Sequence, residues 1–175
     1  MALGFGFVSA QEKEDMAFGA KAGLNLATIT NADGSSTLVG FHVGFFAEFM
    51  LGENFAVQPE LLYSTQGAEF DDGDLKLDYI TIPVMLKYYV ADSFSLEIGP
   101  QVGFLVSAEE VGVDIKDDVK STDFGLNFGA GYDVTPNLII GVRYNLGLNR
   151  WQEALFPGEP ESENSVFQIS LGYRF

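Results

Sequence analysis

Six charged residues lie inside segments that otherwise alternate between apolar and small residues. Three are acids and three are bases, and they are Lys21, Glu48, Glu60, Lys87, Glu97 and Arg143. Counted from the nearest predicted turn, they fall at similar depths and on the same face of their segments. Opposite charges at one depth predict a buried charge network, and a narrow ion path is the alternative. Arg143 is the predicted hub, because its planar guanidinium can hold two carboxylates at once.

His42 is the only histidine in the chain. A histidine beside a serine and an acid can act as a catalytic base, as it does in some barrel enzymes. The sequence sets no such pair beside His42, so we predict a packed, hydrogen-bonded histidine. No catalytic residue is therefore assigned.

Acidic residues crowd the segments that separate the alternating stretches. The run Asp71-Asp72-Gly73-Asp74 offers oxygen ligands for Ca²⁺, but it lacks the spacing of an EF-hand. We therefore expect solvated acidic loops, with no metal and no cofactor.

The composition excludes several other kinds of chemistry. The chain has no cysteine, which excludes a disulfide scaffold, cysteine-ligated zinc and thiol catalysis. Its net charge of -16 argues against nucleic-acid binding, which requires a basic face.

An alternation with a period of two residues runs along the chain and predicts the strands that position these residues. In the fifth strand, Phe94, Leu96 and Ile98 lie on one face, and Ser95 and Glu97 lie on the other. The same pattern predicts eight strands, at residues 18–26, 40–51, 55–64, 79–88, 94–104, 123–133, 138–148 and 167–175. Most are about ten residues long, the length that a tilted strand needs to cross a bilayer.

The connections alternate between short and long. Short turns follow the second, fourth and sixth strands, and longer links fall at about 28–38, 67–76, 108–121 and 149–163. Outer-membrane barrels show this asymmetry, with short periplasmic turns and longer outer loops. An even number of strands then places both termini in the periplasm.

These patterns predict the fold class all-β, as a closed, eight-stranded, antiparallel, up-and-down transmembrane β-barrel. Its apolar face points outward, and its sheet closes because lipid cannot satisfy unpaired backbone groups. A soluble lipocalin-like barrel is the alternative, and its outward faces would be polar. Pro59, Pro83 and Pro100 cannot donate to a ladder, so we predict that they mark bulges.

The two ends of the chain suggest export and assembly signals. The apolar run before Val8-Ser9-Ala10 resembles the end of a signal peptide, which predicts cleavage after Ala10. Residues 1–10 are then a signal remnant and residues 11–175 are the barrel domain. The terminal Phe175 resembles the signal that the outer-membrane insertion machinery reads.

Several segments resemble the PorT-type outer-membrane β-barrel family. They read VQPELLYS at 57–64, YITIPVMLKY at 79–88, EIGPQVG at 97–103, DFGL at 123–126 and GYRF at 172–175. The resemblance covers essentially all of residues 16–175. It implies an outer-membrane location and no enzymatic activity. The founding member of that family belongs to a protein secretion system.

The sequence thus predicts a non-catalytic outer-membrane barrel with a filled lumen and acidic outer loops. Its role would be in envelope integrity or partner binding, which includes protein secretion. The predicted partners are outer-membrane lipid, the insertion machinery during assembly, and an envelope protein at the outer loops.

Two other functions are weighed against this one. A narrow small-solute or ion channel is disfavoured by bulky inward residues, which are Phe46, Leu62, Tyr79, Met85 and Leu105. A rim enzyme that acts on lipid or protein is disfavoured by the absence of a second histidine or a clear triad.

Overall fold

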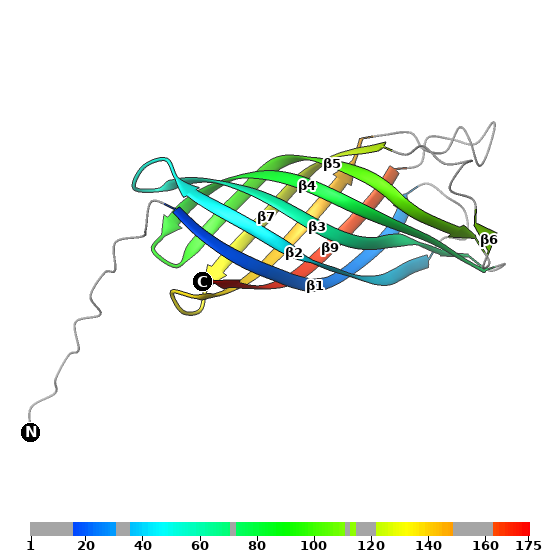
Figure 1. The fold of residues 1–175 in the computed structure, drawn as a ribbon, viewed down its shortest axis with the longest axis horizontal. Coiled ribbons are helices and arrows are strands. Elements are labelled where there is room, and N and C mark those ends of the chain that lie inside the picture. The colour runs from blue at the N-terminus through cyan, green and yellow to red at the C-terminus, as the bar shows by residue number, and fades with distance from the viewer. Residues whose placement is uncertain (1–15, 31–35, 71–72, 111–112, 115–121, 149–162) are drawn as a thin grey trace, which may run out of the picture.

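The computed structural model describes residues 16–30, 36–70, 73–110, 113–114, 122–148 and 163–175 (Figure 1). The strands are β1 (Met16–Thr30), β2 (Ser36–Met50), β3 (Phe55–Phe70), β4 (Gly73–Ala91), β5 (Phe94–Glu110), β6 (Val113–Asp114), β7 (Thr122–Asp133), β8 (Leu138–Gly147) and β9 (Glu163–Arg174). Every predicted strand is present, and most are longer than predicted. Among the described residues, no helix is long and apolar enough to cross a membrane.

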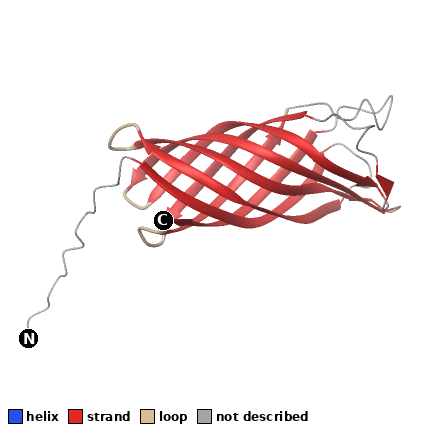
Figure 2. Ribbon diagram, viewed as in Figure 1, coloured by secondary structure: helices blue, strands red, loops and turns tan. Residues whose placement is uncertain are grey.

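The strands form a closed antiparallel barrel. Each long strand pairs with the next along the chain, β9 pairs with β1, and the pairing of β4 with β5 completes the circle. The two-residue β6 is added to the end of β5 and is not part of the wall. The predicted closed, eight-stranded, up-and-down barrel is therefore confirmed (Figure 2).

The strand register determines how steeply the strands tilt. A continuous path of paired residues leads from Met16 around all eight strands and returns to β1 at Leu26, ten residues further along. The path passes through Phe49, Val57, Leu86, Ile98, Phe128, Tyr144 and Phe167. An offset of this size tilts the strands by about 35–45° and leaves an interior that side chains can fill.

The outward face of the barrel is apolar and ringed by aromatic residues. The short turns, the start of β1 and the C-terminus share one end of the barrel, here called the turn end; the other is the far end (Figure 1). Near the turn end, an outward aromatic residue occurs on every long strand except β8. These residues are Phe18, Phe49, Phe55, Tyr88, Phe94, Tyr132 and Tyr173. Lipid-facing barrels carry aromatic girdles of this kind.

Toward the far end, the outward face changes from apolar to polar at one level. On β3 and β4, the apolar residues Tyr63 and Ile80 are followed by Thr65 and Asp78. On β5, the outward Phe104 and Val106 are followed by Ser107. The strands nevertheless continue to pair beyond this level, so the predicted long link at 67–76 is wrong. Most of it is strand, with Gly67 paired to Lys76, because backbone pairing persists where the apolar alternation stops.

The structure contradicts the bulges predicted at Pro59, Pro83 and Pro100. Each proline coincides with an interruption in one ladder: β2–β3, β3–β4 and β4–β5, respectively. The register is the same on both sides of each interruption, so no residue is inserted. A proline removes one N–H group, yet its backbone angle suits an extended strand. Register shifts occur elsewhere, between Thr37 and His42, between Asp78 and Tyr79, and between Tyr89 and Ala91.

Candidate functional site: ion pairs inside the barrel

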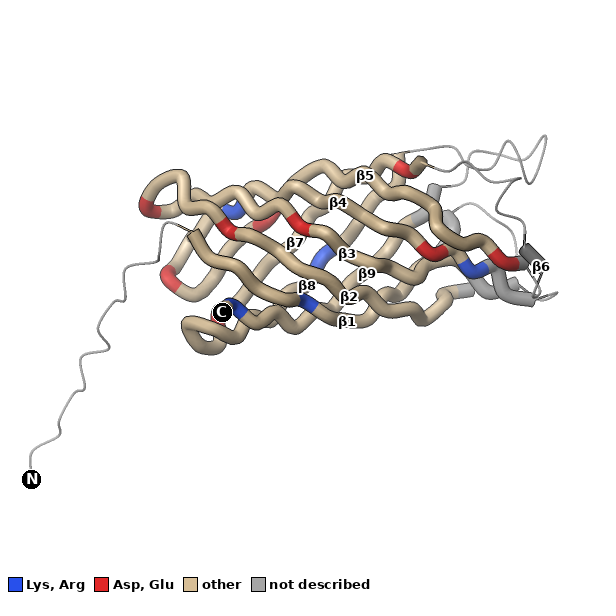
Figure 3. Tube along the Cα trace, in the orientation of Figure 1, with Lys and Arg blue, Asp and Glu red and all other residues tan. Residues whose placement is uncertain are grey.

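Strand alternation points the six predicted charged side chains into the barrel, where glycines leave room for them. Lys21 is paired with Gly44, and both Glu97 and Arg143 are paired with Gly129. The Glu97 carboxylate extends over a further glycine, because a Cβ added at Gly131 would lie 3.0 Å from Glu97 Oε1. Acidic and basic positions intermix in the half of the barrel nearer the turn end (Figure 3).

Arg143 is the centre of a first cluster. Its two terminal nitrogens, Nη1 and Nη2, each lie 2.8 Å from one carboxylate oxygen of Glu60, and Nη2 also lies 3.0 Å from Glu97 Oε2. Lys21 Nζ lies 3.0 Å from Glu60 Oε1, and Gln58 Nε2 donates to the same oxygen over 2.7 Å. Strands β8 and β3 are opposite each other in the barrel, so the Arg143–Glu60 pair crosses the lumen.

Glu48 is the centre of a second cluster, nearer the turn end. Lys87 Nζ lies 2.6 Å from Glu48 Oε2, and the Tyr89 hydroxyl donates to the same oxygen over 2.9 Å. Arg174 Nη2 lies 3.2 Å from Glu48 Oε1, and Arg174 Nη1 lies 3.4 Å from Asp133 Oδ2. This cluster ties the last strand, β9, to β2 across the intervening β1.

The structure brings all six predicted charges together, in two clusters that are connected through Gln58 and through a 3.6 Å ion pair between Lys87 and Glu97. Asp133 and Arg174 join them, although neither is among the six charges predicted from the sequence. The Arg174 side chain is 13% exposed and is ion-paired to Glu48. Its inward position on the last strand was a signal for this role that the alternation already contained.

His42 lies in a belt of amides further toward the far end. Its Nδ1 lies 2.8 Å from Asn25 Oδ1, which also accepts a hydrogen bond from Gln168 over 3.1 Å. Sequence reasoning did not find Ser64, which pairs directly across from His42. The Ser64 hydroxyl accepts from Asn25 and Gln66 instead, and both His42 and Ser64 are buried. The two residues are therefore not arranged as a base and its nucleophile.

A third, apolar layer follows the amide belt toward the far end. Its buried inward residues are Ala27, Leu38, Leu77, Leu105, Ala108 and Val166. The interior thus changes from ion pairs to amides to aliphatic side chains along the barrel axis.

The described residues contain no group of three or more histidine or acidic side chains that could hold a metal ion. Asp71 and Asp72 of the predicted acidic loop lie outside the described residues.

A family model described as "Outer membrane protein beta-barrel domain" matches residues 9–151. The chain belongs to this outer-membrane β-barrel family. Together with the apolar outward face, this membership places the protein in the bacterial outer membrane. The narrower resemblance to the PorT-type family stays a prediction.

Solved structures of outer-membrane proteins share the fold of this barrel. Neisserial surface protein A (NspA) superposes with a TM-score of 0.59 at 17% identity, over 90% of this chain and 97% of that one. Ail, the attachment invasion locus protein of Yersinia pestis, superposes with a TM-score of 0.56 at 17% identity, over 92% of this chain and 99% of that one. The comparison with curated protein sequences gives no significant match.

Proposed function

We propose that this outer-membrane barrel is non-catalytic, that its filled interior blocks the passage of solutes, and that it acts through its far end. The observation that carries the proposal is the Arg143–Glu60 pair, which joins opposite walls through two 2.8 Å contacts. A charged side chain held across the lumen occupies the space through which a solute would pass.

The other layers support a closed interior. Five bulky inward residues are at most 5% exposed, and they are Phe46, Leu62, Tyr79, Met85 and Leu105. An eight-stranded barrel has an interior just wide enough for side chains to fill. An ion would have to leave water, cross the aliphatic layer and then separate the ion pairs.

Conductance in planar lipid bilayers tests this proposal. We expect the wild-type protein to show little steady conductance. The double variant Arg143→Ala with Glu60→Ala, which removes the pair from both walls, should conduct more. A large and stable wild-type conductance would contradict the proposal and favour the narrow channel.

We further propose that the turn end faces the periplasm and the far end faces outward. The chain has no cysteine, so single cysteines give unambiguous labels. A membrane-impermeant maleimide should label Glu109→Cys at the far end of intact cells and leave Gly52→Cys in the first short turn unlabelled. Both sites are exposed, so they form a matched pair. The reverse labelling would overturn the orientation.

Sequence charge suggests the chemistry of a partner at the far end. In the segments 66–78, 107–123 and 149–163, acidic residues outnumber basic ones, which favours a partner with a basic surface. Ail was crystallised with the heparin analogue sucrose octasulfate, a polyanion. The acidic segments of the present chain favour the opposite charge on its partner. A secretion protein of the envelope, as the PorT-type resemblance suggests, is one candidate class.

Charge-neutral variants test this partner. Asp78→Asn with Glu109→Gln changes two outward, described side chains without touching the interior. Crosslinking in native membranes should recover less of a basic envelope protein with this variant than with the wild type. An unchanged recovery would argue against a charge-driven contact.

A further inference from the structure

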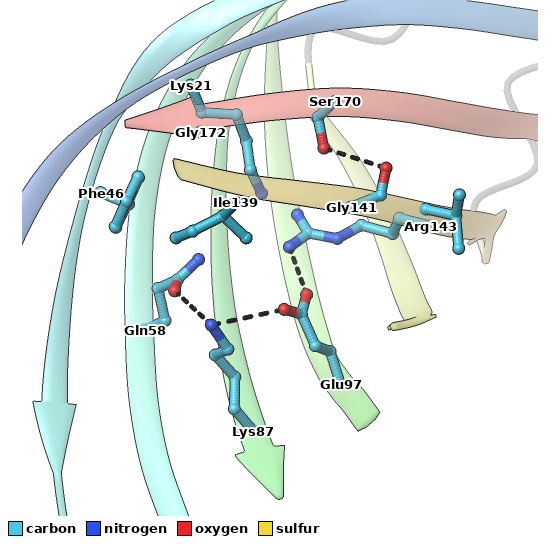
Figure 4. A pocket seen from close by; sticks show the side chains of 11 residues that line it. Lys21, Phe46, Gln58, Lys87, Glu97, Ile139, Gly141, Arg143, Ser170 and Gly172 are labelled. Carbon is cyan, nitrogen blue, oxygen red and sulfur yellow. Dashed lines mark hydrogen bonds and ion pairs between the residues drawn. The ribbon is translucent and has the colours of Figure 1, made fainter. Parts of the chain in front are cut away.

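A small cavity lies between the two charge clusters, with a volume of about 20 Å³. Four charged side chains, those of Lys21, Lys87, Glu97 and Arg143, converge on it from different strands (Figure 4). Gly172 of β9 also lines the cavity. A cavity needs roughly 10–15 Å³ to hold one water molecule, and the water needs two to four polar partners. The cavity meets both requirements.

Two links connect the clusters at this cavity: a hydrogen-bonded link through Gln58, and an ion pair that is too long for a hydrogen bond. Gln58 accepts from Lys87 over 3.1 Å and donates to Glu60 over 2.7 Å. The other contact, from Lys87 Nζ to Glu97 Oε1, measures 3.6 Å, which is too long for a hydrogen bond. At this length, both groups keep hydrogen-bonding capacity for a water molecule that lies beside the contact.

Lys21 also lacks acceptors on the cavity side. An ammonium group has three N–H donors. The described contacts give Lys21 Nζ one acceptor, Glu60 Oε1, and that oxygen already receives Gln58 and Arg143. The side chain is only 11% exposed, so bulk water cannot supply the remaining partners freely.

We propose that this cavity is a binding site for one ordered water molecule. The water accepts hydrogen bonds from Lys21 and Lys87 and donates one to Glu97. It thereby adds a second hydrogen-bonded connection between the Arg143 cluster and the Glu48 cluster, beside the one through Gln58. This inference does not depend on whether the barrel conducts.

The charges favour water over a small anion. The ion-paired bases Lys21, Lys87, Arg143 and Arg174 are balanced by the acids Glu48, Glu60, Glu97 and Asp133. An added anion would therefore lack compensation. A halide also has no hydrogen to donate to Glu97, whereas water both accepts and donates.

A high-resolution crystal structure of the wild-type protein grown with bromide tests the occupant directly. We expect one density peak within hydrogen-bond distance of Lys21, Lys87 and Glu97, without anomalous signal from bromide. A bromide peak would overturn the proposal by identifying an anion site. A cavity without density would overturn it as well.

A matched pair of glycine variants tests the energetic role of the water. An added Cβ at Gly172, on the cavity wall, would meet Ile139 and Phe46 at 3.5–3.7 Å, and one at Gly103 would meet Tyr79 at 3.3 Å and Asp123 at 3.5 Å. The Gly172 methyl group would make only ordinary van der Waals contacts, whereas the Gly103 methyl group needs the Tyr79 ring to move by a few tenths of an ångström. Both alanines gain from the lower flexibility of the unfolded chain. We expect Gly103→Ala to raise the urea midpoint. Gly172→Ala should raise it less or lower it, because its methyl group displaces the water. Equal shifts would overturn the proposed role.

A double-mutant cycle then separates the water from simple packing. Lys21→Met and Lys87→Met should shift the urea midpoint non-additively in the wild type, by about 0.3 M or more. In the Gly172→Ala background, the non-additivity should be smaller, because only the contacts through Gln58 and Glu60 then connect the two lysines. The same non-additivity in both backgrounds would show that the lysines are coupled without the water.

Discussion

Replacing Arg143 with alanine is the sharpest test of the ion pairs inside the barrel. Its guanidinium is 4% exposed and makes three contacts of 2.8–3.0 Å with Glu60 and Glu97. After the substitution, Glu60 keeps Lys21 and Gln58 as partners. Glu97 keeps only the 3.6 Å contact with Lys87 among its described ion pairs with Lys and Arg.

The expected loss in the free energy of unfolding arises because the substitution leaves these carboxylates buried without Arg143. Breaking a buried ion pair by removing one member typically costs about 3–5 kcal/mol. If the free energy of unfolding changes by about 2 kcal/mol per molar urea, the urea midpoint falls by about 2 M. Arg143→Lys keeps the charge and loses the planar fork, so it should cost less than Arg143→Ala.

Arg174→Ala is the control for Arg143→Ala, because it removes another ion-paired arginine at a different position along the barrel axis. Arg174 is also ion-paired, but its removal leaves Glu48 with Lys87 Nζ at 2.6 Å and with the Tyr89 hydroxyl at 2.9 Å. We therefore expect a smaller loss than for Arg143→Ala.

Gel migration of unboiled and boiled samples provides the assay, after incubation in urea with detergent. A closed barrel with paired backbone groups should resist SDS until it is boiled, so the two bands report the folded fraction. An Arg143→Ala midpoint equal to that of the wild type would refute the reasoning, since it would mean that the buried carboxylates need no partner.

Three further predictions concern assembly and packing. Deleting Phe175 should lower the amount of barrel inserted in cells and leave refolding in detergent unchanged; the opposite result would show a structural role. Gly44→Ala should destabilise the barrel by about 1–3 kcal/mol in the urea assay, because its Cβ would overlap the Leu61 carbonyl. Gly52→Ala meets no atom within 4 Å, so it should leave the urea midpoint unchanged or raise it slightly. N-terminal sequencing of the mature native protein should show cleavage after Ala10, and a mature chain that begins well before that site would refute the signal.

The strands and their two faces could be predicted from the sequence because alternation is local. Successive side chains of a strand point to opposite sides, so the inward direction of Glu60 or Arg143 follows from the spacing of their neighbours. The same argument predicted the bulky inward residues Phe46 and Met85. The ends of the strands were predicted less well, since the pairing of Gly67 with Lys76 continues beyond the apolar pattern.

Proline behaviour was not predictable from alternation alone. A missing N–H group is compatible with either a bulge or a skipped hydrogen bond. Only the register shows that β3 pairs with β2 on both sides of Pro59 without an inserted residue.

The sequence by itself determined which charges enter the barrel, and the tertiary structure decided which of them meet. Pairing depends on the offset of ten residues around the barrel, which is a property of all eight strands together. That offset places Arg143 across from Glu60 and separates it from Glu48, which Lys87 and Arg174 hold instead. No local pattern contains this information, because residues far apart in the chain become neighbours only when the sheet closes.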